Sequence, residues 1–217
     1  MRPRKVVAVV GTGTDIGKTW VAARLLTQLR AAGLQVAGRK PAQSFDPGDQ
    51  PAGRDAAVLG TATNELPEEV CPPHRWYETA MAPPMAAEVL GRPPFTIDDL
   101  MEELVWPPDA VDVGLVETAG GARSPLAADG DCLDYCAALD PDVVVLVADA
   151  GLGTINAVRL TLGALGSLAN SSVVVLNRFD DHSDLHHRNL EWLRDRDERK
   201  ILTIPGGDAA LLDIVRG

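Results

Sequence analysis

Short runs of apolar residues, rich in valine, recur along this chain between longer amphipathic stretches. The first run, 6–10, contains only valine and alanine. Runs of this kind form strands that are buried on both faces, as in a parallel sheet. The pattern predicts strands at 6–10, 35–39, 111–116, 143–147, 173–176 and 201–204.

The stretches between these runs carry apolar residues at helical spacing. After the first run, Val21, Leu25 and Leu29 repeat every four positions, and Gly33 follows as a C-terminal stop signal. Residues 46–53 are polar and rich in Pro and Gly, which predicts a loop. No helix or strand is assigned within the proline-rich segment 67–94. Further helices are expected at 55–60, 97–105, 133–139, 155–168 and 185–199, and in a last segment that ends at Val215.

Alternation of strand and helix is typical of βαβ units, which build a parallel sheet with helices on both faces. The expected fold is therefore an α/β fold of three layers around a mostly parallel sheet. A length of 217 residues suits one compact domain, which we assign to 1–217.

The charge of the chain limits its partners. It has 20 Lys and Arg against 31 Asp and Glu, a net charge of −11, and no cluster of basic residues offsets the acids. Such a surface repels nucleic acid and anionic lipid, so neither is expected as a partner. No stretch approaches the roughly 20 apolar residues of a membrane span, and the basic N-terminus leads into a glycine-rich loop. We therefore expect a cytoplasmic protein.

Cysteine and histidine give little evidence of a disulfide or metal site. The three cysteines are odd in number and include no C-x-x-C pair. Cys132 and Cys136 lie four apart, which favours packing on one face of a helix. His182, His186 and His187 stand among aspartates, and we interpret them as the solvated start of a helix.

The strongest functional signal follows the first expected strand. Residues 11–19 read Gly-Thr-Gly-Thr-Asp-Ile-Gly-Lys-Thr, between a strand and a helix. This is the setting of a P-loop, in which glycines let backbone N–H groups turn toward phosphates and the helix N-terminus adds positive potential. Lys18 would reach the β- and γ-phosphates, and the Thr19 hydroxyl can bind Mg²⁺. The strict motif has Gly where this chain has Thr12, and the first glycine of this chain stands one residue earlier, at Gly11.

Two further strand ends are expected beside this loop, because the carboxyl ends of parallel strands share one edge of a sheet. Lys40 follows the second strand, and Glu117 follows the strand at 111–116. A carboxylate at such a strand end is typical of the second element that holds Mg²⁺. Asp55 would complete the oxygen ligands with Thr19 and Glu117, although an aspartate at this place also suits a helix N-cap.

Together these residues resemble the dethiobiotin synthetases, and the resemblance extends over most of the chain. The family's loop G-T-x-T-x-x-G-K-T matches 11–19, including the displaced glycine. Its V-E-G-A-G-G matches 116–121, with Thr118 in place of a glycine. The other matches are Lys40-Pro41 with Ser44, Asp55 before a short helix, Gly151 to Asn156, and Asn177 at the end of a late strand.

The resemblance implies an ATP-dependent ligase that closes a ureido ring on 7,8-diaminopelargonic acid with carbon dioxide. One amine forms a carbamate, the carbamate oxygen attacks the γ-phosphate of ATP, and the second amine displaces phosphate. Neutralisation of charge by Lys18, Lys40 and Mg²⁺ suits these anionic reactants. The resemblance further implies a dimer in which the substrate carboxylate rests on the partner's 151–156 turn. An ordinary strand-to-helix turn is the other interpretation of that segment.

The resemblance also assigns roles to individual residues. The implied catalytic residues are Lys40, Lys18 and Thr14. The implied nucleotide contacts are Gly13, Thr14, Asp15, Ile16, Gly17, Lys18, Thr19, Asn177 and Pro205. The implied metal ligands are Thr19, Asp55 and Glu117. The implied substrate contacts are Ser44, Gly120, Gly121, Gly151, Leu152, Gly153 and Asn156.

Two other functions stay open. A nucleotide switch like the partition and septum-site ATPases would share the fold, but those proteins carry an additional lysine near the start of the loop, where this chain has Thr12, Gly13 and Thr14. A related ligase with an altered substrate is the second, because residues 83–85 read Pro-Pro-Met where the family often has Ser-Pro-His. Cobyrinate-type synthetases need a glutaminase domain that 217 residues cannot hold.

Overall fold

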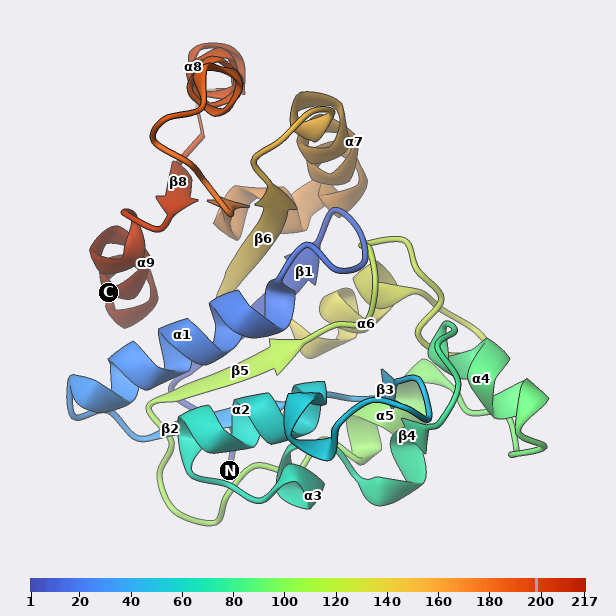
Figure 1. The fold of residues 1–217 in the computed structure, drawn as a ribbon. Helices are drawn as coiled ribbons and strands as arrows, with labels where there is room; N and C mark the ends of the chain where they lie inside the picture. Colours follow the sequence, from blue (N-terminus) through green and yellow to red (C-terminus); the bar gives the residue numbers. More distant parts are fainter. Residues whose placement is uncertain (198) are drawn as a thin grey trace.

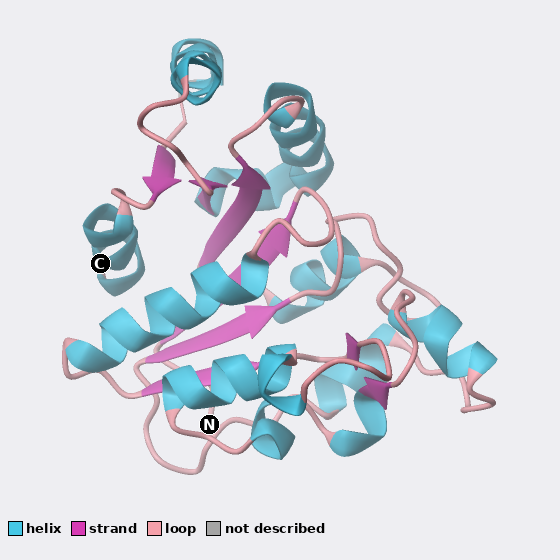
Figure 2. Ribbon diagram, in the orientation of Figure 1, coloured by secondary structure: helices cyan, strands magenta, loops and turns pink. Residues whose placement is uncertain are grey.

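The computed structural model describes residues 1–197 and 199–217. Within them, six parallel strands form one sheet in the order β2-β5-β1-β6-β7-β8 (Figures 1 and 2). The α/β fold with a mostly parallel sheet that the sequence predicts is confirmed. The strands are β1 Lys5–Gly11, β2 Val36–Arg39, β5 Val113–Glu117, β6 Val143–Asp149, β7 Ser172–Asn177 and β8 Ile201–Ile204.

Helices cover both faces of the sheet, because successive residues of a strand point to opposite sides. On β1, Val6, Ala8 and Val10 are buried in one core, whereas Val7 and Val9 are buried in the other. The first core is closed by α5 (Ile97–Glu102), α6 (Cys132–Leu139), α7 (Thr154–Leu165) and α8 (Asp184–Asp197). The second core is closed by α1 (Lys18–Ala31), α2 (Asp55–Thr63) and α9 (Asp208–Arg216). This arrangement is the predicted set of three layers.

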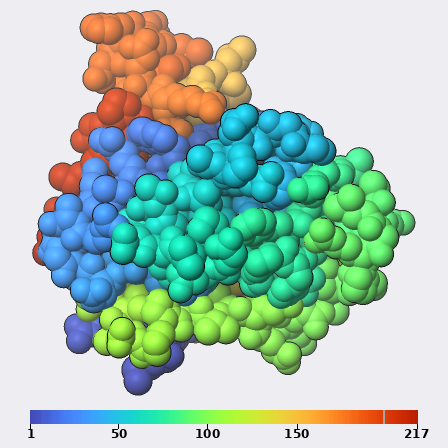
Figure 3. Space-filling view, turned by 60° about the horizontal axis from the view of Figure 1, so that its bottom comes forward, coloured from blue at the N-terminus to red at the C-terminus, as the bar shows by residue number. Residues whose placement is uncertain are grey.

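Residues 43–53 and the segment 67–94, for which the sequence predicts no helix or strand, form a group of short elements beyond the carboxyl ends of β2 and β5 (Figure 1). The two-residue strands β3 (Gln43–Ser44) and β4 (Trp76–Tyr77) pair with each other in parallel. The other members are the helices α3 (Pro67–Val70) and α4 (Pro83–Val89) and the 3₁₀ turns Pro51–Gly53 and Pro73–Arg75. In the space-filling view, segments from cyan to green cover this side of the molecule (Figure 3).

Two helices end at residues other than the predicted ones, and the backbone conformation explains both differences. Helix α2 continues past residue 60 to Thr63, and Asn64 then ends it with a left-handed φ of 68°. Helix α7 ends at Leu165 rather than 168, because Gly166 leaves the helical region with φ 56° and ψ −123°. A 3₁₀ helix, Gly166–Ser171, follows it.

Three other predicted bounds also shift. Strand β5 includes Glu117, because this residue still pairs with Val9 of β1. Helix α5 ends before Glu103, whose carboxylate accepts two hydrogen bonds from Arg75. Helix α8 ends at Asp197, and the remainder of the helix predicted over 185–199 includes residue 198, which lies outside the described residues.

Within the described residues, no helix has both the length and the apolar character needed to cross a membrane.

Candidate functional site

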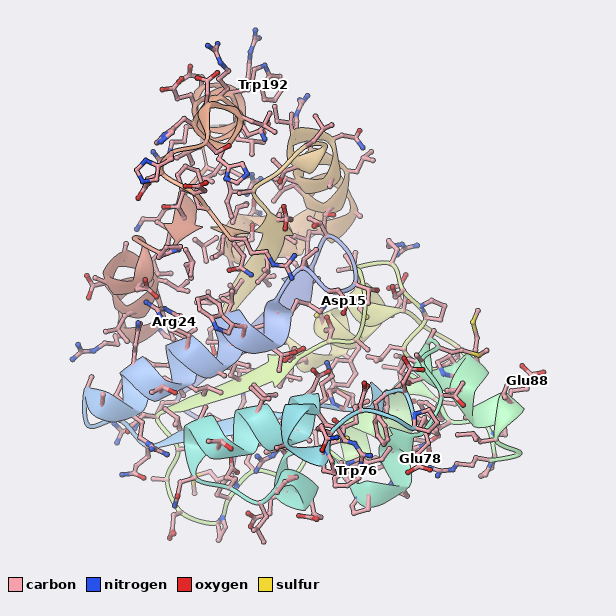
Figure 4. The ribbon with its side chains drawn as sticks, viewed as in Figure 1. Asp15, Arg24, Trp76, Glu78, Glu88 and Trp192 are labelled. Atoms are coloured by element: carbon pink, nitrogen blue, oxygen red, sulfur yellow. The ribbon has the colours of Figure 1, made fainter. Side chains whose placement is uncertain are left out.

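The loop between β1 and α1 carries the glycine-rich sequence at 11–19. Gly17 caps α1 with a left-handed φ of 88°, and Asp15, labelled in Figure 4, also has a positive φ of 57°. The buried side chain of Lys18 turns back over the loop, where its Nζ donates to the carbonyl of Gly13 at 2.9 Å. A Cβ at Gly11 would lie 2.8 Å from Lys18 Cδ. Gly11 is therefore the residue that makes room for the lysine.

Two residues at the carboxyl end of β7, the last residue of the strand and the one after it, hold this loop in place. Asn177 Nδ2 donates to the carbonyl of Ile16 at 2.9 Å, and Arg178 donates to the carbonyl of Asp15. Arg178 is also paired with Asp149 at the end of β6, at 3.0 Å. Asn177 thus supports the backbone of the loop, while its contact with a nucleotide stays a prediction.

Four side chains meet at the carboxyl ends of β2 and β5. Lys40 Nζ lies 2.7 Å from Asp55 Oδ2 and 2.8 Å from Glu117 Oε1. The Thr19 hydroxyl lies 2.7 Å from Asp55 Oδ1 and 2.8 Å from the same Glu117 oxygen. The parallel topology places the carboxyl ends of β2 and β5 at one edge of the sheet, as the sequence predicts, and the two strands are neighbours there; α1 brings Thr19 to their ends.

This cluster has the ligands that a hard cation would use. The Thr19 hydroxyl has one proton and can donate it to only one of its two carboxylate neighbours. At its contact with the other carboxylate, two oxygen atoms face each other with no proton between them. Glu117 Oε2 is buried without a hydrogen-bond partner among the described residues. Carboxylate and hydroxyl oxygens are the ligands that Mg²⁺ prefers. Thr19, Asp55 and Glu117 therefore fit a magnesium ion in chemistry and in position.

Burial and neighbouring charges shift the titration of these groups. Burial lowers the pKa of Lys18, and the nearby ammonium of Lys40 lowers it further. At Lys40 burial acts in the same direction, but Asp55 and Glu117 outweigh it and raise the pKa above its ordinary value. Burial raises the pKa of Glu117, whereas Lys40 overcomes burial at Asp55 and holds that pKa below its ordinary value. Lys40 is therefore an ammonium ion held between two acids.

A cavity of about 880 Å³ opens over this cluster. Ser44 and Gly120, two of the predicted substrate contacts, line it, and Gly121 packs behind it with its Cβ position 3.4 Å from Gly13 Cα. The loop after β5 thus lies directly on the phosphate loop. The main lining groups are the phosphate loop and α1 (Thr14, Asp15, Gly17, Lys18, Thr19, Trp20), the strand ends (Lys40, Glu117), and the segments 43–55, 80–83 and 119–124.

Several predicted site residues lie outside the lining of this cavity, and they include Gly13, Ile16 and Asn177 as well as two more distant parts of the chain. The turn from Gly151 to Asn156 follows β6; Leu152 in it is 91% exposed, and Gly153 caps α7 with φ 91°. Pro205 follows β8 at the edge of the sheet and is exposed. The roles assigned to these residues stay predictions.

Sequence reasoning missed several polar residues of the site. Gln43 accepts a hydrogen bond from the backbone of Ala56 at 3.0 Å, and Ser124 accepts one from Gly121 at 2.8 Å. Arg54 and Arg178 line the cavity. Arg178 could have been found from its place beside Asn177, whereas the others lie in loops whose path no periodicity reveals.

The cysteines and histidines are not lining residues of the cavity, although Cys132 Sγ donates to the carbonyl of Ala119, which is one. Cys132 and Cys136 are buried on α6, as predicted, and burial raises their pKa values to about 11 and about 12. His186 accepts a hydrogen bond from the backbone of Asp180 at 3.0 Å and packs against Phe179. In residues 1–197 and 199–217, no three His, Cys, Asp or Glu side chains form a group that could hold a metal.

Comparison with known proteins gives two kinds of match. The model of a family described as an AAA domain matches residues 5–204. A protein of Haloferax mediterranei named ATP-dependent dethiobiotin synthetase BioD is 35% identical over 200 residues, which cover 91% of this chain and 82% of the relative. A protein of the same name from Rhodococcus jostii is 41% identical over 194 residues, covering 87% of this chain and 80% of the relative.

Solved structures share the fold at much lower identity. A plasmid partition protein from Borrelia burgdorferi superposes with a TM-score of 0.58 and 13% identity over 99% of this chain and 97% of its own. Chloroplast FtsY from Physcomitrella patens gives a TM-score of 0.53 with 18% identity over 100% of this chain and 66% of its own. At these identities the likeness extends to the fold alone.

Proposed function

Because this chain belongs to the family of ATP-dependent dethiobiotin synthetases, we propose that it forms the ureido ring of dethiobiotin from 7,8-diaminopelargonic acid, carbon dioxide and ATP. The observation that carries the proposal is the convergence of Lys18, Lys40 and Thr19 with two carboxylates at one cavity. The alternative of a nucleotide switch has weaker support, because the plasmid partition protein shares the fold at only 13% identity.

The reaction has three steps that balance without a redox partner. An amine of the substrate adds to carbon dioxide and loses a proton, which forms a carbamate. The carbamate oxygen then attacks the γ-phosphorus of ATP, the bond to the β–γ bridging oxygen breaks, and ADP leaves. The second amine attacks the carbamoyl carbon, the carbon–oxygen bond to phosphate breaks, and a proton is lost as the ring closes. Phosphate is the final leaving group.

The residues of the cluster contribute mainly by positioning and by charge. Lys18 would contact the β- and γ-phosphates, because it starts the helix that follows the phosphate loop. Lys40 lies between Asp55 and Glu117, where its fixed positive charge would face the carbamate and the transferred phosphoryl group. Thr14, which also lines the cavity, would donate its hydroxyl to the nucleotide.

We also propose that Thr19, Asp55 and Glu117 bind Mg²⁺, for which the shared Glu117 oxygen and the unpartnered Glu117 Oε2 are the support. Bound Mg²⁺ would neutralise charge on the phosphate oxygens during transfer. The protein's part is to hold the three oxygens together. Asp55 would remain ionised in this arrangement, since Lys40 keeps its pKa low.

We further propose that the enzyme is a two-fold homodimer and that the substrate carboxylate rests on the partner's turn 151–156. The turn does not line the cavity of its own chain, and α7 begins at Thr154 with its positive end at the turn. Leu152 and Asn156 are exposed. We place the reaction in the cytoplasm, a setting that suits the free, buried cysteines at 71, 132 and 136.

A phosphate-release assay tests the function. The complete mixture of ATP, Mg²⁺, diamine and bicarbonate should release phosphate and yield a product whose mass equals that of dethiobiotin. Omission of either the diamine or bicarbonate should abolish release. Equal release from nucleotide alone would support the switch function, and release with a different diamine but not with diaminopelargonic acid would support a ligase of altered substrate.

A further inference from the structure

One wall of the cavity contains three buried polar atoms that have no hydrogen-bond partner among the described residues. They are Gln43 Nε2, Ser44 Oγ and Arg54 Nε. The amide and guanidinium nitrogens can only donate. A buried donor without an acceptor destabilises the protein, because it has lost its hydrogen bonds to water and gained none in return. This wall is therefore suited to a ligand that brings acceptor oxygens.

Arg54 is the cation on this wall, and its guanidinium group stacks on an aromatic ring instead of pairing with a carboxylate among the described residues. Its guanidinium carbon lies 3.8 Å from the centre of the buried Phe45 ring. In the described part of the chain Arg54 forms no ion pair, although the protein carries a net charge of −11. A guanidinium fixed by stacking keeps its N–H groups available for a planar oxyanion.

The backbone places Arg54 next to the reacting centre. Arg54 caps α2, and the next residue, Asp55, contacts both Lys40 and Thr19. Gln43 is oriented by the same helix, because its Oε1 accepts a hydrogen bond from Ala56 N. With its oxygen occupied, the carboxamide of Gln43 has only its Nε2 donors left for the cavity. Lys18 and the phosphate loop form another wall of the cavity.

We propose that Arg54, assisted by Gln43, binds an oxyanion of the reacting groups within this cavity. The oxyanion belongs either to the terminal phosphoryl group of the nucleotide or to the carbamate that receives it. This inference rests on the proposed function. Arg54 then supplies a positive charge from the segment before α2, in addition to those of Lys18 and Lys40. Together the three cations stabilise the negative charge on the reacting oxygens during phosphoryl transfer.

The test compares Arg54→Ala and Arg54→Lys with wild type and with Arg196→Ala. Arg196 also stacks on a ring, that of Trp192 on α8, which Figure 4 labels far from the phosphate loop. We expect Arg54→Ala to reduce kcat by roughly tenfold or more, with a Tm within about 2 °C of wild type. Arg54→Lys should be intermediate, and Arg196→Ala should be unchanged. Added guanidinium ion at low concentration should restore part of the activity of Arg54→Ala only.

Binding measurements identify which oxyanion is bound. A weaker nucleotide Kd in the absence of the diamine assigns Arg54 to the phosphoryl group. An unchanged nucleotide Kd with a raised KM for the diamine, or a lower kcat alone, assigns it to the carbamate. Gln43→Leu should change the same constant in the same direction, to a smaller extent.

Either of two results overturns the inference. The first is a set of Arg54 variants whose kcat, KM and Kd lie within about twofold of wild type. The second is a loss of activity that guanidinium does not rescue and that Arg54→Lys shares in full, which would make the role of Arg54 structural. Wild-type protein that is inactive with the diamine and bicarbonate would instead overturn the proposed function itself.

Discussion

The side chain of Asn177 occupies the space directly beside Gly17. A Cβ added to Gly17 would lie 2.2 Å from Asn177 Nδ2, and Gly17 itself has a φ of 88°. The same Nδ2 donates to the carbonyl of Ile16. The end of β7 and the start of α1 therefore fit together only when residue 17 has no side chain.

Gly17→Ala should destabilise the protein by about 1–3 kcal/mol, because the left-handed backbone and the contact with Asn177 both oppose a Cβ. Gly33→Ala is the matched control, since Gly33 has a similar φ of 85° but open space around its Cβ position. It should cost about 1 kcal/mol from backbone strain alone. In a double-mutant cycle by urea unfolding, Asn177→Ala should relieve part of the cost of Gly17→Ala. Additive effects of the two changes would show that the close contact is unimportant.

Lys18→Ala should lose nearly all turnover while the fold survives. Lys18 is the lysine of the phosphate loop, and removal of a buried charge contact to phosphate costs several kcal/mol in the transition state. Steady-state phosphate release and circular dichroism measure the two properties. The exposed Lys200→Ala serves as the control and should behave as wild type. Turnover of Lys18→Ala within about threefold of wild type would contradict the assignment.

Glu117→Gln and Asp55→Asn should each raise the Mg²⁺ concentration for half-maximal activity by about tenfold or more, because each removes a charged oxygen from the proposed metal site. Titration of Mg²⁺ at saturating nucleotide measures the shift. Glu191→Gln, an exposed position on α8, should not change the requirement. An unchanged Mg²⁺ requirement in both site variants would exclude these residues as ligands.

Glu103 links the stability of the protein to pH. Burial raises the pKa of Glu103, but hydrogen bonds from Arg75 and His74 outweigh it and hold the pKa below its ordinary value. A depressed pKa in the folded state contributes stability above the unfolded pKa of about 4.3, and this contribution is lost as the pH falls through the folded pKa. Glu103→Gln should therefore cost about 0.5–1 kcal/mol at pH near neutral, since solvent screens this half-buried pair, and progressively less under acid conditions.

Urea unfolding at a series of pH values measures this difference. Glu102→Gln, at the exposed neighbouring position, should track wild type at every pH. A gap between wild type and Glu103→Gln that stays constant or widens in acid would show that the ion pair with Arg75 is not the cause.

The meeting of Lys40 with Glu117 could be predicted, because parallel strands bring their carboxyl ends to one edge and the sequence places a polar residue at each end. The place of Gln43 and Arg54 in the wall of the cavity could not be predicted. The geometry of this wall depends on β3 and β4, strands of two residues, and on the parallel stacking of Tyr77 with Phe95 at 6.0 Å. Contacts between such distant and short segments leave no periodicity in the sequence. Arg54 and Gln43 were missed for this reason.

A substitution in the turn from Gly151 to Asn156 tests whether a second chain completes the site. If the substrate carboxylate rests on the partner's turn, Asn156→Ala should raise the KM for the diamine by about tenfold through loss of a hydrogen bond to a charged group, while the nucleotide Kd stays nearly unchanged. Asn170→Ala, at an exposed position in the 3₁₀ helix after α7, is the control and should change neither constant. Sedimentation velocity should show a dimer at assay concentrations, because an isologous interface gives two equivalent sites. A stable monomer that turns over at the full wild-type rate would show that each chain forms its substrate site alone.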